Sequence, residues 1–157
     1  MTSQLDFYSI SREIFNSENP FSRSNQLGHI TASGLVIRNS RALLIFHPYI
    51  KEWMQSGGHI DAGETPIDAS IREVYEETGV ICNPIEGYLD PIDIDLHEIQ
   101  ANSKKGEGAH LHIDLLFLFE VAGEGEPLEE IRKAWLPFEE ITNTRLRRAI
   151  NKLENKV

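Results

Sequence analysis

The alternation of apolar and polar residues predicts a β-hairpin in the first third of the chain. Residues 30–37 are rich in β-branched and aliphatic side chains, which favour strands. The turn-forming pair Asn39-Ser40 separates them from a second apolar run at residues 42–46. A third, shorter strand is expected at residues 52–55, shortly before the pair Gly57-Gly58.

Apolar residues at helical spacing mark both ends of the chain. Residues 1–27 form an N-terminal extension in which a short helix is predicted from four such residues: Leu5, Ile10, Ile14 and Phe15. Residues 143–156 are amphipathic and predict a C-terminal helix with three residues directed inward: Leu146, Ile150 and Leu153.

The most complete set of helix signals lies in the middle of the chain. Thr65 is a candidate N-cap, Pro66 suits the first helical position, and Asp68 stands where a capping box has an acid. Gly79 supplies a C-terminal stop. A helix is therefore predicted at residues 66–78, with an apolar stripe made of Ile67, Ile71 and Val74.

The second half of the chain returns to strand character. Strands are expected at residues 84–96, 109–121 and 134–136, with a polar loop at 101–108. The order strands, helix, strands, helix predicts an α/β (α+β) fold in which a mixed β-sheet is sandwiched between helices. A length of 157 residues suits a single domain that spans residues 1–157.

Composition narrows the classes of partner. No apolar run approaches the roughly 20 residues of a membrane-spanning helix, and no secretory signal is visible. The single cysteine, Cys82, excludes an intramolecular disulfide, so a cytoplasmic location is expected. A net charge of -10 argues against a nucleic-acid partner, which needs clustered Lys and Arg. The acidity serves either solubility or the binding of a cation.

Three glutamates in the predicted central helix share one face, because Glu73, Glu76 and Glu77 stand at i, i+3 and i+4. Such carboxylates repel one another by a few tenths of a kcal/mol, or roughly 0.2–0.5. They also oppose the helix dipole near the C-terminus. One interpretation is a solvated acidic face, partly neutralised by Arg72. The other is a bound cation, for which oxygen ligands select Mg²⁺ or Mn²⁺.

The residues around these glutamates decide between the two interpretations. From Gly58 the chain has five residues, Glu64, seven residues, Arg72-Glu73-Val74, one residue, Glu76-Glu77, one residue, and Gly79-Val80. This spacing resembles the signature of the Nudix hydrolase superfamily at every fixed position. The resemblance implies a loop–helix–loop motif on a mixed sheet. It also implies hydrolysis of a nucleoside diphosphate linked to another moiety X, by attack of a metal-activated water.

Catalytic and metal-binding roles follow from the resemblance. It implies that Glu73, Glu76 and Glu77 bind the metal ion, Mg²⁺ or Mn²⁺. A carboxylate must also accept a proton from the attacking water. Glu77 or Glu76 could do so, as could a glutamate from the loop region before the long strand, for which Glu98 and Glu107 are the candidates.

The resemblance assigns supporting roles to residues beside the glutamates. Arg72 would orient one of them through a charge-assisted hydrogen bond, and Glu64 would brace the loop against the helix. Gly57 and Gly58 would let the backbone approach the metal and the substrate, with the Gly57 carbonyl as a candidate ligand. Trp53 is a candidate for stacking on the substrate.

A polar face is also expected on the longest predicted strand. His110, His112 and Asp114 alternate with apolar residues and so project from one face. They could bind a second metal ion such as zinc, contact substrate phosphates, or serve the structure only. His97 could join either arrangement, and His59 is a loop residue or a phosphate contact.

The substrate X is left open by the sequence. Nucleotide sugars or ADP-ribose, oxidised nucleoside triphosphates and dinucleoside polyphosphates all fit the signature. A non-catalytic nucleotide sensor and an isoprenoid-diphosphate isomerase are the alternatives from other functional classes. Dimers are frequent in the superfamily, so residues 1–27 either contribute to a homodimer or cover the sheet edge within one chain.

Overall fold

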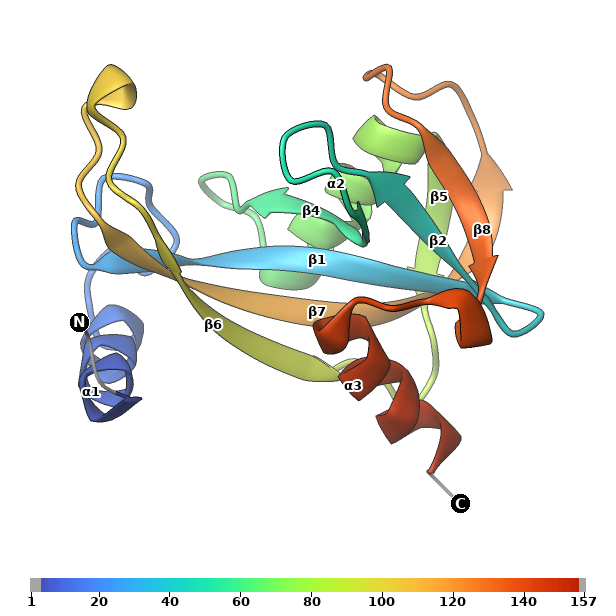
Figure 1. The fold of residues 1–157 in the computed structure, drawn as a ribbon, viewed down its shortest axis with the longest axis horizontal. Helices are drawn as coiled ribbons and strands as arrows, with labels where there is room; N and C mark the ends of the chain where they lie inside the picture. Colours follow the sequence, from blue (N-terminus) through green and yellow to red (C-terminus); the bar gives the residue numbers. More distant parts are fainter. Residues whose placement is uncertain (1–3, 156–157) are drawn as a thin grey trace.

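The computed structural model describes residues 4–155, and the side chains from residue 7 (Figure 1). The elements in chain order are α1 (Gln4–Phe15), β1 (Gly28–Arg38), β2 (Arg41–Phe46), β3 (Trp53–Met54), β4 (Ser56–His59), α2 (Pro66–Thr78), β5 (Val80–Pro84), β6 (Asp93–Ile99), η1 (Ser103–Lys105), β7 (His110–Glu124), β8 (Lys133–Pro137), η2 (Phe138–Glu140) and α3 (Thr144–Glu154). Within residues 4–155, no helix is long and apolar enough to cross a membrane.

The eight strands form one mixed sheet built around β1 and β7, which run parallel and side by side (Figure 1). Each of these two strands has two antiparallel partners on its outer side. β4 and β2 lie along β1, and β6 and β5 lie along β7. β3 and β8 then pair with β2. The pair β1–β7 therefore lies at the centre of the sheet, and strands from both halves of the chain are placed on either side of it.

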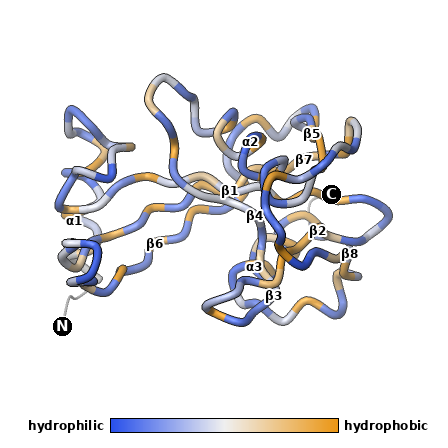
Figure 2. The backbone as a smooth tube through the Cα atoms, turned by 90° about the horizontal axis from the view of Figure 1, so that it is seen from above, coloured by the Kyte–Doolittle hydropathy of each residue, from blue (hydrophilic) through white to orange (hydrophobic). Residues whose placement is uncertain are grey.

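Helices cover both faces of this sheet, as the sequence predicted. On one face, Ile14 of α1 and Val74 of α2 are fully buried in one apolar cluster, to which Phe119 of β7 also belongs. On the other face, Leu146 and Ile150 of α3 join a second apolar cluster. The alternation of hydrophobic and hydrophilic residues along the strands, which separates these two clusters, can be followed in Figure 2.

The face that α3 covers changes from polar to apolar along the central strands. At the apolar end it carries Leu35 of β1 and Leu116 and Leu118 of β7, which pack under α3. At the other end it carries six polar residues: His29, Thr31, Ser33, His110, His112 and Asp114. Because side chains alternate along a strand, all six lie on the face opposite to α2. The fold thus leaves a polar half-face beside a packed core.

Local signals explain the central helix. The Thr65 hydroxyl accepts a hydrogen bond from the Asp68 N–H at 3.2 Å, and Pro66 begins the helix. Gly79 ends it in the left-handed region at φ 79°, which favours glycine. The predicted bounds of 66–78 are confirmed. In the β1–β2 turn, Asn39 and Ser40 both have positive φ (53° and 58°), as a two-residue hairpin requires.

The strands of the structure differ from those predicted in three places. Residues 85–92 of the strand expected at 84–96 form no strand, since Pro84 is the last residue of β5, which was otherwise not predicted, and β6 begins only at Asp93. The strand expected at 52–55 is limited to Trp53–Met54. β4 was not predicted, because two of its four residues are glycines, which are depleted in strands. Pairing with β1 overrides that preference.

The terminal helices follow the sequence pattern. Ile14 of α1 and Leu146 and Ile150 of α3 are fully buried. α3 ends at Glu154, and residue 156 of the predicted helix lies outside the described residues, as does the side chain of Leu5. Phe15, the last apolar residue of α1, is half exposed.

Candidate active site

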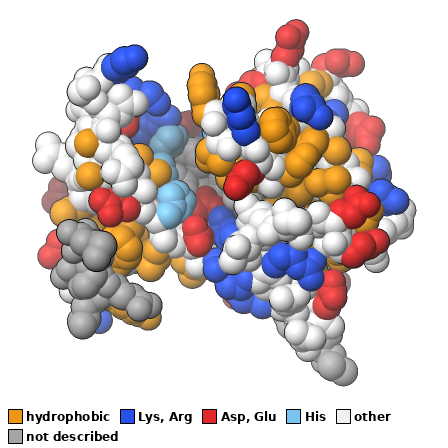
Figure 3. All heavy atoms as spheres, in the orientation of Figure 1, with side chains coloured by type: hydrophobic (Ala, Val, Ile, Leu, Met, Phe, Trp, Pro, Cys, Tyr) orange, Lys and Arg blue, Asp and Glu red, His pale blue; other side chains and the backbone are white. Residues whose placement is uncertain are grey.

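A cavity of about 1360 Å³ opens beside the polar half-face. Its lining combines two glutamates of α2, Glu73 and Glu77, with the backbone of Gly57 and Gly58 in β4. Histidine side chains form part of the wall of a hollow in the molecular surface, with acidic groups close by (Figure 3). The signature residues and the polar strand face therefore meet in one space.

The two lining glutamates are carboxylates with unusual surroundings. Glu77 is 6% exposed and accepts a hydrogen bond from the Gly57 N–H at 3.2 Å. Burial raises the pKa of Glu77 to about 8, and the charges of Glu73 and Glu129 add to the shift. Burial also raises the pKa of Glu73, although a hydrogen bond from Arg72 opposes this. Glu76, the third signature glutamate, is half-buried beside Arg72 and is not part of the lining.

Arg72 ties the loop before α2 to the helix. Its guanidinium donates two hydrogen bonds of 2.8 Å to the Glu64 carboxylate, in a bidentate pair. It also contacts Glu73 at 3.0 Å and donates to the His59 carbonyl at 2.9 Å. The hydrogen bonds from Arg72 to Glu64 hold the pKa of Glu64 below its usual range. One cation thus fixes the position of Glu73 relative to β4.

The close approach of β4 to α2 depends on Gly58. A Cβ atom at this position would lie 2.6 Å from Oε1 of Glu73, closer than side-chain contacts allow. The absence of a side chain at Gly58 leaves space beside the β4 backbone, in the cavity that the carboxylates of Glu73 and Glu77 also line. Within the described residues, Glu73 forms an ion pair with Arg72 only, and the neighbouring Glu77 forms none. A hard divalent ion fits this donor set, since oxygen ligands suit it and its charge offsets the repulsion.

Glu129 is a site residue that the sequence did not indicate. It lines the cavity, and its charge contributes to the raised pKa values of Glu73 and Glu77. Two backbone hydrogen bonds hold its loop on α2, because the N–H groups of Leu128 and Glu129 donate to the Glu76 carbonyl at 2.8 and 3.0 Å. Glu129 lies in an acidic loop with no distinctive spacing, so only the fold reveals it.

Glu98 and Glu107, the two loop-region candidates for the proton acceptor, lie away from the two lining glutamates. Glu98 is exposed on β6, where it pairs with Leu111, and Glu107 is exposed in the turn after η1. Neither belongs to the lining of the cavity. Trp53 packs its ring 5.4 Å from that of Phe46, beside the second core cluster, and also lies outside the lining.

Five of the six histidines form one network of ring contacts. His29, His59, His97 and His110 all lie within 5.7 Å of at least one other ring in the network, and His112 contacts each of the other four. Burial lowers the pKa of His112 to about 3 and that of His29 to about 4. Burial and the nearby Arg23 likewise lower the pKa of His59 to about 4. These rings are therefore neutral at pH 7.

Asp114 belongs to a different part of the polar half-face from the histidines. It accepts hydrogen bonds from Thr31 at 2.7 Å and from Ser33 at 2.5 Å. Arg145 of α3 donates to it at 2.5 Å and also to Asp93 at 3.0 Å. Arg145 and Asp114 both line the cavity, so this buried network forms one of its walls.

The comparisons with known proteins agree with this fold. The NUDIX domain family model matches residues 28–155. The chain therefore belongs to the NUDIX family. A Lactococcus lactis protein named "Probable DHNTP pyrophosphohydrolase" is 37% identical over 111 residues, which are 71% of this chain and 65% of the relative. The chain thus spans slightly less than two thirds of that relative's length.

Solved structures resemble the fold. A NUDIX-family hydrolase from Clostridium perfringens matches with a TM-score of 0.60 at 22% identity, covering 83% of this chain and 97% of the other. The dihydroneopterin triphosphate pyrophosphohydrolase of E. coli matches with a TM-score of 0.58 at 15% identity, covering 81% and 96%. At such identities the likeness concerns the fold alone.

Proposed function

We propose that this protein is a divalent-metal-dependent pyrophosphohydrolase. The observation that carries the proposal is the approach of Glu73 to the backbone of Gly58 and of Glu77 to the N–H of Gly57, inside a cavity large enough for a nucleotide-sized ligand. Membership of the NUDIX family and the name of the Lactococcus lactis relative support the same reaction class.

Glu73 and Glu77 would hold the ion, with the Gly57 carbonyl as a further ligand and Mg²⁺ or Mn²⁺ as the ion. Glu76 lies beside the proposed ion site rather than in the cavity lining. Arg72 contacts the carboxylates of both Glu76 and Glu73. When bound, the ion neutralises charge on the diphosphate oxygens and makes a bound water more acidic. The chain's own contribution is to present the carboxylates in fixed positions, through the bidentate Arg72–Glu64 pair.

The reaction needs a carboxylate that accepts a proton from the attacking water. The water oxygen bonds to phosphorus, one P–O bond of the diphosphate breaks, and the leaving phosphate takes the electron pair. We assign the proton-accepting role to Glu129, because it faces the same cavity as Glu73 and Glu77 and its loop is anchored on the Glu76 carbonyl.

Replacing Glu129 with glutamine is expected to lower kcat by about 10²-fold or more, the usual contribution of a general base, with a smaller change in KM. Steady-state kinetics at saturating Mg²⁺ measure both constants. Glu130→Gln is the matched control, since the neighbouring residue is exposed and lies outside the lining. Equal kcat values for the two variants would remove Glu129 from the proton-accepting role.

We propose a substrate with a flat ring system and a di- or triphosphate chain. A metal ion held at the carboxylate end of the cavity would bind the phosphates, and Phe21, Ile45 and Met54 supply an apolar part of the lining. A nucleoside diphosphate linked to another group has this chemistry. Dihydroneopterin triphosphate has it too, and the Lactococcus lactis relative favours it as the first compound to test.

The test is a hydrolysis screen with Mg²⁺ and with Mn²⁺, in which products are identified by mass. The panel contains dihydroneopterin triphosphate, ADP-ribose, nucleotide sugars, NADH, dinucleoside polyphosphates, nucleoside triphosphates and triphosphorylated RNA. We expect metal-dependent release of pyrophosphate or of a nucleoside monophosphate. Binding of these compounds without turnover of any of them would overturn the enzyme proposal in favour of a sensor.

A further inference from the structure

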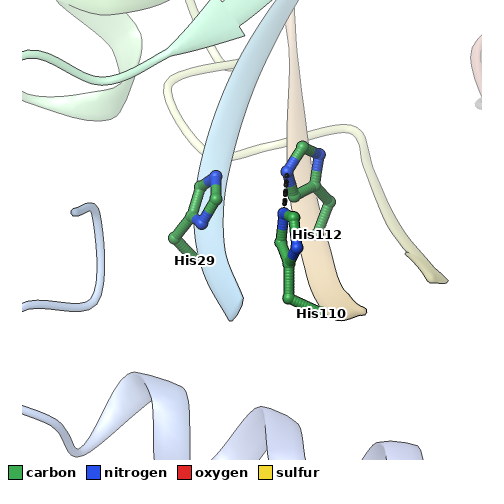
Figure 4. Close-up of side chains that lie close together, drawn as sticks. All are labelled: His29, His110 and His112. Carbon is green, nitrogen blue, oxygen red and sulfur yellow. Dashed lines mark hydrogen bonds between the residues drawn. The ribbon is translucent and has the colours of Figure 1, made fainter. Parts of the chain in front are cut away.

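Three histidines meet at the end of the sheet where β1 and β7 begin (Figure 4). The parallel register of the two strands sets His29 beside His112. His110 lies two residues before His112 in β7, and its side chain is on the same face. One ring nitrogen of each residue lies within 4.8 Å of one ring nitrogen of the other two. Small rotations about the side-chain bonds would bring all three nitrogens onto one ion.

His29 is the most unusual member of this group. It is 2% exposed, and among the described residues neither of its ring nitrogens has a hydrogen-bond partner. A buried polar atom without a partner costs about 1–3 kcal/mol, so nearly all such atoms in proteins are paired. Its ring nevertheless stands 4.5 Å from that of His112 and 5.3 Å from that of His110, measured between centroids. An electron-pair acceptor between these rings would give one of the two His29 nitrogens a partner.

His110 is oriented in the way that metal-binding histidines commonly are. Its Nδ1 lies 2.9 Å from the Gly108 carbonyl, which accepts only from an N–H, so the proton is on Nδ1. The free lone pair is then on Nε2, which lies 3.3 Å from Nε2 of His112. Two imidazole nitrogens on a tetrahedral zinc ion, each bonded at about 2.0–2.1 Å, are separated by about 3.3 Å.

We propose that His29, His110 and His112 bind a transition-metal ion, with Zn²⁺ as the ion whose geometry fits best. Three imidazole nitrogens suit zinc and its neighbours, whereas Mg²⁺ requires oxygen ligands. The site is therefore separate from Glu73 and Glu77 in both residues and ion preference. It does not depend on the proposed hydrolase activity.

The surroundings of the three histidines suit such a site. His59 and His97 pack their rings 5.7 and 5.5 Å from that of His112 and complete the shell around it. Three protein ligands leave a tetrahedral ion one further position, for water or for an oxygen of a ligand. Because His112 lines the cavity, that ligand can be the molecule whose phosphates reach the glutamates.

The test is a titration of the metal-free protein with Zn²⁺ and with Co²⁺, in excess Mg²⁺ so that the carboxylates are already occupied. Calorimetry gives the stoichiometry, and X-ray absorption gives the ligand shell. We expect one Zn²⁺ per chain, a shell of nitrogen ligands at about 2.0–2.1 Å, and a visible absorption band of tetrahedral Co²⁺. Zinc at 100-fold its Kd is expected to raise Tm by about 5–10 °C.

Two variants and one control identify the ligands. His29→Phe keeps the buried ring and removes both nitrogens, and His110→Asn removes a ligand at the partly exposed edge. Both are expected to weaken Zn²⁺ binding by at least about 100-fold, since loss of an outer-shell partner alone costs 10–100-fold. The control is His47→Asn, which removes the histidine outside the network while keeping an acceptor for the N–H groups of Tyr49 and Ile50.

Two results would overturn the proposal. One is Zn²⁺ binding that Mg²⁺ displaces completely, because it would mean that only the carboxylates bind. The other is an unchanged Zn²⁺ affinity in folded His29→Phe and His110→Asn. If His29→Phe fails to fold, His110→Asn still decides. None of these measurements uses hydrolysis, so their failure and the failure of the proposed function are distinguishable.

Discussion

Glu77→Gln is expected to lower metal-dependent hydrolysis by about 10³-fold or more while leaving the protein folded. The carboxylate is a proposed metal ligand in a cavity where charge stabilisation is strong, and glutamine keeps the shape without the charge. The Gly57 N–H, which donates to Glu77 at 3.2 Å, can donate to the amide oxygen instead. Steady-state kinetics with Mg²⁺ and thermal unfolding without metal measure the two effects.

The stability of this variant has an expected sign. In the metal-free protein the pKa of Glu77 is raised to about 8, whereas in the unfolded chain it is near 4.5. Between these two values the folded state keeps a proton that the unfolded state has lost, so stability falls as pH rises from about 4.5 to about 8. Glu77→Gln removes this loss, and metal-free Tm at pH 8 should therefore be equal to or above that of the wild type.

The same titration predicts how metal binding depends on pH. An ion must displace the proton from Glu77, so the apparent Mg²⁺ affinity should rise with pH up to about 8 and then level off. Glu86→Gln, which changes an exposed glutamate outside the cavity lining, is the comparison. A Glu77→Gln enzyme with wild-type activity would exclude Glu77 from the metal site.

Asp93→Asn is expected to destabilise the protein by about 3–5 kcal/mol, the usual cost of breaking a buried ion pair by removing one partner. The Asp93 side chain is 1% exposed and accepts hydrogen bonds from three cations of α3. These are Arg145 at 3.0 Å, Arg148 at 2.7 Å and Lys152 at 2.7 Å. Asp93 therefore holds α3 on β6, and Arg145 is left without one of its two charged partners in the variant.

The effect of Asp93→Asn should depend on pH. Burial alone would raise the pKa of Asp93, but the hydrogen bonds from Arg148, Lys152 and Arg145 outweigh it and hold the pKa far below its usual value near 3.8. The contribution of the ionised Asp93 to the free energy of unfolding is therefore present above pH 3.8, and it is lost as pH falls toward the folded-state pKa. The wild type and the variant should converge in strong acid.

Chemical denaturation at several pH values measures this difference. The control is Asp90→Asn, an exposed position three residues away, where a change within about 0.5 kcal/mol is expected. A loss below 1 kcal/mol for Asp93→Asn at pH 7 would mean that α3 is held by its apolar contacts alone. A second consequence is that the cavity wall formed by Arg145 should loosen, which ligand affinity would report.

The parts of this protein that the sequence determined are local ones. The bounds of α2 follow from Thr65, Pro66 and Gly79, whose capping and turn preferences act within a few residues. Glu73, Glu76 and Glu77 share a face because helical spacing puts them there. Arg72 and Glu64 were recognisable from their spacing within the signature, although their bidentate pair is visible only in the structure.

The tertiary structure decided which distant segments meet. His29 lies beside His112 only because β1 and β7 pair in parallel, and parallel pairing requires a long connection that no short-range pattern specifies. Glu129 reaches the glutamates of α2 because its loop hydrogen-bonds to the Glu76 carbonyl. β4 forms from a glycine-rich stretch because β1 offers it a partner. Helix caps and helical spacing act between residues that are close in the chain. The cavity and the histidine cluster depend instead on pairing between distant segments, which forms only when the whole sheet is assembled.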